Sequence, residues 1–230
     1  MKHSAFTTSN DHIAKNLELV KERIKKICDS NNINHSSLEL IVVTKTRSEF
    51  EIISAINAGH LVFAENRVQE AQKKWPKIKQ KFPEVRLHLI GPLQTNKISD
   101  ALKVFDVIQT VDRPRVAIAI ADEMAKKGKK MPCFIQVNIG DEPQKSGIET
   151  NKADKFINEC RSDYGLEIKG LMCIPPKNDD PSPYFSFLKE IANRNSISLL
   201  SMGMSADYAK GIELGATHIR LGQAIFGYRK

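Results

Sequence analysis

Cysteine is scarce in this chain: Cys28, Cys133, Cys160 and Cys173 are the four among 230 residues, and they lie far apart with no C-x-x-C spacing. This distribution argues against a disulfide framework and against a cysteine zinc site, and it is typical of reduced thiols in the cytoplasm. No two histidines have the spacing of metal ligands either. The sequence therefore predicts a cytoplasmic protein without a bound metal.

Long apolar runs are also missing. No stretch approaches the roughly 18 apolar residues that cross a membrane, and the polar N-terminal segment lacks the apolar centre of a secretory signal. We therefore expect neither a membrane span nor export. Hydrophobic residues make up 41% and charged residues 27% of the chain, which excludes global disorder and is enough for a full core.

Acidic residues are the minority charge, with 27 Asp and Glu against 35 Lys and Arg, for a formal net charge of +8. The basic residues are dispersed in lysine pairs, most of them in predicted helices among acidic and amide side chains, as on solvated faces. No helix-turn-helix, zinc-finger or RNA-binding motif accompanies them. We expect no specific nucleic-acid binding, although non-specific association stays an alternative. Attraction of a small anionic ligand fits the charge equally well.

Short apolar runs alternate with longer amphipathic stretches along the chain. Eight runs predict strands, at 38–44, 61–64, 85–90, 104–110, 133–138, 168–173, 198–202 and 218–221. The stretches between and around them predict helices, at 13–28, 49–58, 68–78, 97–102, 114–126, 152–160, 183–193, 206–214 and from 223 onward.

This alternation predicts parallel strands, because each helical crossover returns the chain in the same direction. A closed (β/α)8 TIM barrel and an open doubly wound sheet both satisfy it. Eight strands, the length and the lack of a G-x-G-x-x-G turn favour the barrel, with an extra N-terminal helix. No linker-like segment interrupts the sequence, so residues 1–230 are predicted to form one domain.

Lys45 directly follows the first predicted strand, on the strand face shared by Ile41 and Val43. In a barrel the active site lies at the carboxyl ends of the strands. There, apolar walls and cationic neighbours would lower the pKa of the Lys45 amine and make it nucleophilic, as Schiff-base chemistry requires. The alternative is an ordinary exposed lysine after a strand.

Two glycine- and serine-containing turns follow the last two predicted strands, at 201–205 and at 220–227. Barrels commonly bind phosphate at these two turns, although ordinary strand–helix turns use the same residue types. A reactive lysine beside a phosphate site suggests a phosphorylated aldehyde, above all pyridoxal 5′-phosphate (PLP). A phosphosugar aldolase would use the same parts. Arg220 favours PLP, because an arginine facing the pyridine nitrogen keeps the ring neutral and a weak electron sink.

From about Leu40 onward the chain resembles the pyridoxal phosphate homeostasis protein family. The resemblance rests on the number and order of matching segments: VVTKT at 42–46, FAENRVQE at 63–70, HLIGPLQTNK at 88–97, QVN at 136–138, KSG at 145–147, GLM at 170–172, SMGMS at 201–205 and RLGQAIFG at 220–227. It implies a monomeric PLP-binding barrel similar to the N-terminal domain of alanine racemase.

The resemblance also implies residue roles. Lys45 would form an aldimine with PLP, and Arg220 would face the pyridine nitrogen. Four residues would surround the phosphate: Ser201, Ser205, Gly222 and Gln223. Three more would line the pocket: Asn66, His88 and Met204. Arg67 stands where the family frequently has Tyr, which adds a charge near the site mouth. Gln223 stands where the family typically has Thr, so the resemblance does not carry over that side-chain contact to phosphate, although the backbone N–H could still serve.

The resemblance implies a protein that carries or buffers PLP inside the cell without strong catalytic turnover, and we expect PLP-dependent apo-enzymes to be the partners that receive it. A weak amino-acid racemase or a Schiff-base aldolase is the alternative. Alanine racemases place a tyrosine from a second domain and a partner subunit opposite the lysine. The sequence predicts no such tyrosine here, so fast two-base racemisation is not expected.

Overall fold

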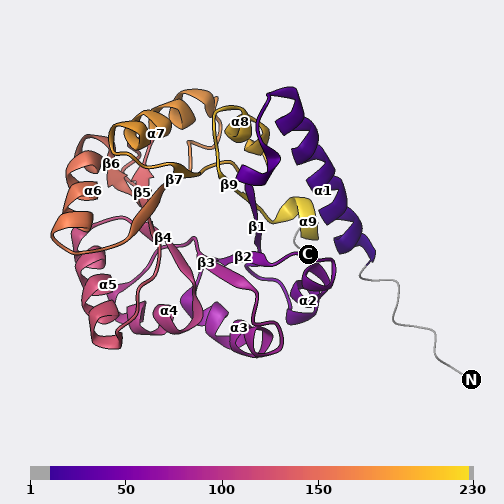
Figure 1. Cartoon of the computed structure of the whole chain (residues 1–230), viewed down its shortest axis with the longest axis horizontal. Helices are drawn as coiled ribbons and strands as arrows, with labels where there is room; N and C mark the ends of the chain where they lie inside the picture. The colour runs from indigo at the N-terminus through magenta and orange to yellow at the C-terminus, as the bar shows by residue number, and fades with distance from the viewer. Residues whose placement is uncertain (1–10, 228–230) are drawn as a thin grey trace, which may run out of the picture.

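The computed structural model describes residues 11–227, in which eight parallel strands close into a barrel surrounded by helices (Figure 1). The barrel strands are β1 (Glu39–Val43), β2 (Val62–Glu65), β3 (Arg86–Leu89), β4 (Val107–Val111), β5 (Cys133–Asn138), β7 (Ile168–Cys173), β8 (Leu199–Ser201) and β9 (His218–Leu221). The ring closes because β1 pairs with both β2 and β9, and β4 pairs with both β3 and β5. The predicted (β/α)8 TIM barrel is confirmed.

The outer ring consists of α1 (Asp11–Ser30), α2 (Glu49–Asn57), α3 (Val68–Lys81), α4 (Ile98–Val104), α5 (Pro114–Lys127), α6 (Ala153–Ser162), α7 (Ser182–Arg194), α8 (Tyr208–Glu213) and α9 (Gln223–Phe226). Three 3-10 turns precede strands or helices: η1 (His35–Ser37), η2 (Thr95–Lys97) and η3 (Thr150–Lys152). Among the described residues, no helix is long and apolar enough to cross a membrane.

The N-terminal helix completes the ring of helices. The last helix, α9, has only four residues, and α1 packs across it between α8 and α2 (Figure 1). The buried stripe of α1 is Ile13, Leu17, Val20, Ile24 and Cys28, and the Asn16 side chain donates a hydrogen bond to the Ile225 carbonyl at 2.9 Å. The extra N-terminal helix predicted from the sequence therefore shields the last barrel unit.

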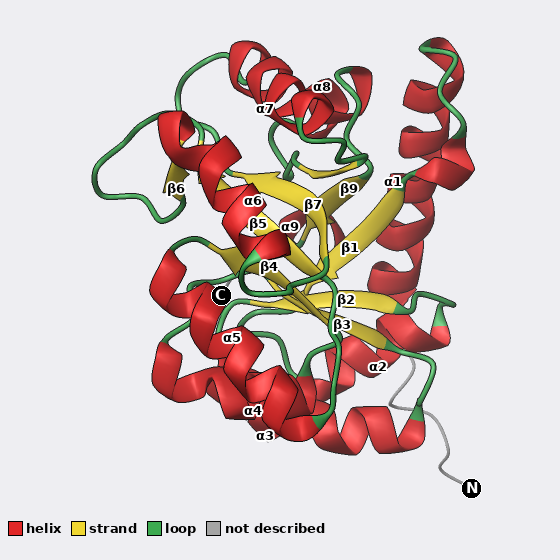
Figure 2. Ribbon diagram, turned by 60° about the vertical axis from the view of Figure 1, so that its left-hand side comes forward, coloured by secondary structure: helices red, strands yellow, loops and turns green. Residues whose placement is uncertain are grey.

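Most predicted boundaries agree with the structure to within two or three residues, and two differences affect the strands. The fourth strand begins at Val107 rather than at 104, because Val104 still belongs to the last turn of α4. A ninth strand, β6 (Ile148–Glu149), pairs with the carboxyl end of β5 outside the ring (Figure 2). With only two residues, β6 has too little periodicity to be recognised in a sequence.

The apolar core lies mainly between the strands and the helices, whereas the barrel interior is partly polar. Two small apolar clusters occupy the interior: one contains Ile41, Val62 and Ala64, the other Val107, Phe134 and Met172. Further buried side chains are polar, and four of them make one hydrogen-bonded chain: Arg220, Ser201, Gln109 and His88. An interior with this composition is suited to orient a charged group at its open end.

Candidate functional site

A cavity of about 870 Å³ lies at the carboxyl ends of the barrel strands. Seven of the nine predicted site residues line it: Lys45, Asn66, Met204, Ser205, Arg220, Gly222 and Gln223. They come from segments far apart in the sequence, after β1, β2 and β8 and at the end of β9. All four strands are neighbours in the order β8, β9, β1, β2, which gathers the set on one side of the mouth.

Lys45 is the second residue after β1, and it is half-buried. It lines the cavity together with Val43, as strand alternation predicts, while Ile41 lies deeper in an interior apolar cluster. The amine therefore belongs to a partly desolvated site rather than to the open surface.

Two glycines allow the backbone to approach closely at this mouth. A Cβ on Gly222 would lie 3.1 Å from the Val43 carbonyl oxygen and 3.3 Å from Val43 Cβ, so the turn after β9 lies directly against the end of β1. A Cβ on Gly91 would lie 2.0 Å from the Asn66 carbonyl oxygen, which excludes any side chain there. Glycine at these positions thus places Gln223 near Lys45 and seats Asn66 at the rim.

Arg220 is buried, with 3% of its surface exposed, and forms part of the cavity wall. Its Nη1 donates to Ser201 Oγ at 2.7 Å and its Nη2 donates to the Cys173 carbonyl at 2.9 Å. Burial lowers the pKa of Arg220, but a guanidinium keeps its proton throughout the physiological range. The site therefore has a permanent positive charge held in a defined orientation.

The cavity lining is strongly cationic. Lys45, Arg47, Lys145 and Arg220 all contribute to it, and the described lining residues include no Asp or Glu. Arg47 donates to the Gly227 carbonyl at 2.7 Å, and Lys145 donates to the Pro175 carbonyl at 3.1 Å. Arg47 and Lys145 also form ion pairs outside the lining, with Glu51 at 3.3 Å and with Glu142 at 2.5 Å. An excess of positive charge remains around the partly desolvated space, so an anionic ligand would lower the electrostatic energy of the site.

The resemblance implies His88 as a pocket residue and Ser201 as a phosphate contact, but both are buried below the cavity and do not line it. Ser201 accepts from Arg220 and donates to Gln109 Oε1 at 2.6 Å, while Gln109 Nε2 lies 2.8 Å from His88 Nδ1. Ser201 thus contacts Arg220 directly, and His88 is linked to it through Gln109 and Ser201. Strand alternation predicts which side a residue faces, but not its depth along the barrel axis.

Several residues at the site escaped sequence reasoning. Arg47, Gln136 and Lys145 line the cavity, and Gln109 lies in the chain of hydrogen bonds below it. For Gln109 and Gln136 a signal existed, because each is a polar residue in the middle of a mostly apolar strand. Lys145 lies in the loop between β5 and β6, where spacing along the sequence carries no information on direction. Among residues 11–227, no group of three His, Cys, Asp or Glu side chains comes together as a metal site.

Residues 9–230 match the family model of the alanine racemase N-terminal domain. The pyridoxal phosphate homeostasis protein of Haemophilus influenzae is 33% identical over 228 residues, covering 95% of this chain and 96% of that protein. The protein of the same name from Escherichia coli is 33% identical over 230 residues, with 94% and 97% covered. This chain belongs to the pyridoxal phosphate homeostasis protein family.

Solved structures agree with membership of this family. The crystal structure of an unknown protein from Bifidobacterium adolescentis superimposes with a TM-score of 0.91 at 29% identity, covering 97% of this chain and 98% of that one. PipY of Synechococcus elongatus, solved with PLP bound, gives a TM-score of 0.81 at 29% identity, with 94% and 100% covered. An alanine racemase of Clostridium difficile, at 14% identity and a TM-score of 0.72, shares the fold over 57% of its own chain.

Proposed function

We propose that this protein binds PLP, with Lys45 as the covalent anchor, and that it carries or buffers the cofactor in the cytoplasm. The observation that carries the proposal is the cavity wall, which combines Lys45 with three further cationic side chains and no carboxylate among its described residues. PLP is an anionic aldehyde and matches this wall. The family name and the PLP bound in PipY support the same ligand.

The residues at the cavity fit the cofactor part by part. When bound, PLP supplies an aldehyde that condenses reversibly with an amine and releases water. Lys45 offers the amine from the end of β1. Gly222, Gln223 and Ser205 offer backbone N–H groups and polar side chains for the phosphate, and Asn66 and Met204 border the remaining space. Arg220 offers guanidinium donors for the pyridine nitrogen.

We propose further that turnover is weak. Arg220 keeps its proton, so a pyridine nitrogen facing it stays neutral and the ring withdraws electrons poorly. None of the described lining residues is a tyrosine: the Tyr184 hydroxyl donates to Asp179 at 2.8 Å outside the cavity, and Tyr208, the first residue of α8, is buried. Among the described lining residues, none is thus a tyrosine that would serve as the second acid–base group of a racemase.

The four cysteines support the cytoplasmic assignment. All four are free and buried, and burial raises the pKa of Cys133, Cys160 and Cys173 to about 12. Thiols held this strongly in the protonated form are inert and are used for packing. We therefore propose that the protein works in a reducing compartment. As the family resemblance and the lack of a linker-like segment suggest, we also propose that it acts as a monomer formed by a single domain.

The first test is the visible absorbance spectrum of the purified protein after incubation with PLP, before and after borohydride, for wild type, Lys45→Ala and Lys73→Ala. Wild type and the exposed-helix control Lys73→Ala should show a band that borohydride removes, with a pyridoxyl mass on the Lys45 peptide. Lys45→Ala should show neither. A wild-type protein that takes up no PLP would overturn the proposal.

A second measurement separates a carrier from an enzyme. The PLP-loaded protein is mixed with a PLP-dependent apo-enzyme, and the recovered activity is titrated against the amount of loaded protein. A carrier transfers at most one equivalent and leaves L-amino acids unchanged. Sustained racemisation of an amino acid, or cleavage of a phosphosugar, would instead favour a weak racemase or a Schiff-base aldolase.

A further inference from the structure

The turn that presents Lys45 has an unfavourable backbone conformation. It comprises residues 44–47 and is closed by a hydrogen bond from the Arg47 N–H to the Thr44 carbonyl at 3.0 Å. Within it, Thr46 has a φ of +64°. Positive φ is uncommon for residues other than glycine, and for a β-branched residue it is a true outlier that persists only where the surroundings enforce it. The enforcing contacts must therefore lie around the turn.

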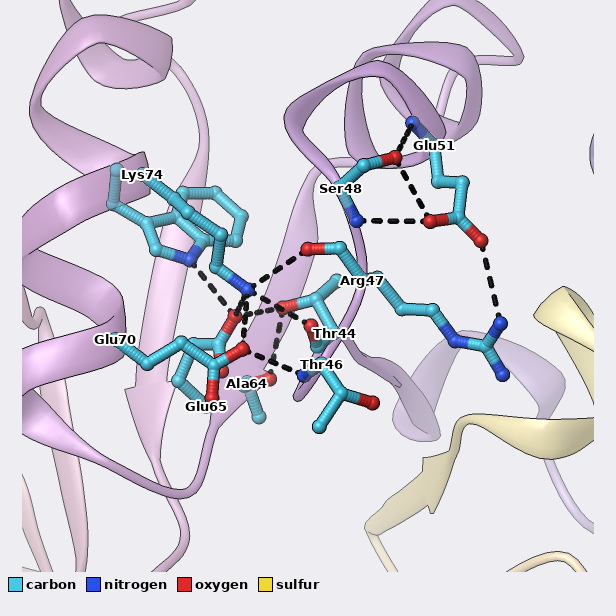
Figure 3. A network of polar contacts seen from close by, with 10 residues as sticks. Thr44, Thr46, Arg47, Ser48, Glu51, Ala64, Glu65, Glu70 and Lys74 are labelled. Carbon is cyan, nitrogen blue, oxygen red and sulfur yellow. Dashed lines mark hydrogen bonds and ion pairs between the residues drawn. The ribbon is translucent and has the colours of Figure 1, made fainter. Parts of the chain in front are cut away.

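Side chains of α3 supply these contacts (Figure 3). Lys74 Nζ donates to the Thr44 carbonyl at 3.0 Å and to the Arg47 carbonyl at 3.2 Å, so one ammonium ties both ends of the turn. Glu70 Oε1 accepts from the N–H of Thr46 at 2.6 Å, which holds the strained residue itself. Three backbone groups of the turn are thus bonded to two residues of one helix turn on α3.

A buried carboxylate holds the Lys74 ammonium in place. Glu65 Oε1 lies 2.6 Å from Lys74 Nζ and also accepts from Thr44 Oγ1 at 2.7 Å and Trp75 Nε1 at 3.3 Å. Glu70 adds a second ion pair to Lys74 at 2.8 Å. Glu65 is fully buried and Lys74 is 9% exposed. This cluster therefore has little freedom to rearrange.

An ion pair at this depth is a poor means of stabilising a fold. Desolvating a carboxylate and an ammonium costs free energy that well-packed apolar side chains of similar volume do not cost. The contacts of Lys74 are directed at the backbone of the Lys45 turn and at the two carboxylates that hold its own charge. Specific control of that turn accounts for a charged residue here, whereas packing of α3 does not require one.

We propose that Lys74, held by Glu65 and acting together with Glu70, is the positioning residue for Lys45. These three residues, which we call the clamp, keep residues 44–47 in the one conformation that directs the Lys45 amine into the cavity. The clamp thereby sets how readily the amine reacts with an aldehyde. The inference rests on the proposed function for its link to PLP, but the clamp itself consists of contacts within the protein and does not depend on PLP.

The test uses Lys74→Met, Glu70→Ala and the double variant Glu70→Ala/Thr46→Gly, with Lys73→Met as the matched control on the exposed face of α3. Trace labelling with acetic anhydride, read by mass spectrometry across pH, reports the reactivity and titration of Lys45, and the exposed Lys155 serves as internal reference. This readout needs no cofactor. PLP affinity is measured in parallel by absorbance titration, and folding by thermal unfolding.

Lys74→Met and Glu70→Ala should change the pH profile of Lys45 labelling while leaving that of Lys155 unchanged. They should weaken PLP binding by about tenfold, equivalent to about 1.4 kcal/mol. Glycine tolerates positive φ, so the double variant should recover most of the affinity that Glu70→Ala loses. Rescue of this kind is not expected if Glu70 acts only on global stability.

Labelling and PLP affinity in folded Lys74→Met that match those of Lys73→Met would overturn the inference. If Lys74→Met fails to fold, Glu70→Ala decides, because its side chain is partly exposed and a wild-type Lys45 profile there contradicts the clamp. A wild-type protein that binds no PLP, yet whose Lys45 profile responds to Glu70→Ala, would defeat the proposed function and support the clamp.

Discussion

At the scale of single residues, the orientation of Arg220 depends on side chains that never reach the cavity. Arg220 donates to Ser201, Ser201 donates to Gln109, and Gln109 donates to His88 Nδ1. Burial lowers the pKa of His88 to about 3, so the ring is neutral at physiological pH and its Nδ1 accepts. All donors point in one direction, which leaves Arg220 a single favourable position for its guanidinium.

Ser201→Ala tests whether this series of hydrogen bonds orients Arg220. The substitution removes an acceptor from Arg220 and a donor from Gln109, so we expect PLP affinity to fall about tenfold and stability to fall by about 1–3 kcal/mol. Thr110→Val is the matched control. The Thr110 hydroxyl makes one buried hydrogen bond, to the Gly91 carbonyl at 2.8 Å, and takes no part in the series of hydrogen bonds from Arg220 to His88. Similar PLP affinities in the two variants would contradict a role of Ser201 in orienting Arg220.

Gly222→Ala tests the close approach at the cofactor turn. The φ of Gly222 is −121°, so alanine is allowed by the backbone, but its Cβ would lie 3.1 Å from the Val43 carbonyl oxygen. The turn must then move away from β1, and we expect weaker PLP binding together with a loss of about 1–3 kcal/mol from overpacking. Isothermal titration with PLP and thermal unfolding measure the two effects. Unchanged affinity would show that this turn does not contact the phosphate.

At the scale of elements, α2 begins immediately after the Lys45 turn with a complete capping box. Ser48 Oγ accepts from the Glu51 N–H at 3.3 Å, and Glu51 Oε2 accepts from the Ser48 N–H at 2.8 Å. Ser48 therefore both ends the Lys45 turn and caps the start of α2. Because the clamp from α3 acts on residues 44–47 and the cap acts on α2, the two devices should be separable by mutation.

Ser48→Ala should lower the free energy of unfolding by about 1 kcal/mol, a decrease in melting temperature of about 2–4 °C for a chain of this length. PLP affinity should stay within about twofold of wild type, since the clamp on the turn is retained. Differential scanning calorimetry and absorbance titration provide the two values. A large loss of affinity with little loss of stability would mean that the cap, rather than α3, positions Lys45.

At the scale of the whole molecule, three buried histidines make stability depend on pH. Burial is the main cause that lowers the pKa of His60 and His218 to about 4 and that of His88 to about 3, from an ordinary value of 6.5. Below about pH 6.5 the unfolded chain therefore binds more protons at these histidines than the folded chain does. Stability from these groups is fully present above about pH 6.5 and is lost as the pH falls toward 4.

Urea unfolding at about pH 5 and about pH 7.5 should give a clearly lower free energy of unfolding at the acidic pH. Burial raises the pKa of Glu65 and Asp112, which acts in the opposite sense, but the three histidines outnumber them. The difference between the two pH values should shrink in His60→Gln, which removes one of the titrating groups. Equal stability at both pH values in wild type would contradict this expectation.

Much of the architecture is determined by the sequence alone, because strand and helix periodicities are local. The eight apolar runs, the amphipathic stripe of α1 and the placement of Lys45, Asn66, Gly222 and Gln223 after strands all follow from short-range patterns. Parallel crossovers then bring the strand ends to one edge. For that reason the carboxyl-end location of the candidate site could be predicted without coordinates, as could seven of its lining residues.

Only the tertiary structure decided how deep each side chain lies along the barrel axis and which side chains contact one another. The register of neighbouring strands pairs Ser201 with His218 and so brings Ser201 beneath Arg220, two residues further along β9. The packing of α3 beside β2 brings Lys74 to the Lys45 turn, where it bonds to Thr44, 30 residues away in sequence. Alternation along one strand fixes a face but not a register, and a helix pattern does not specify which loop its polar side chains meet.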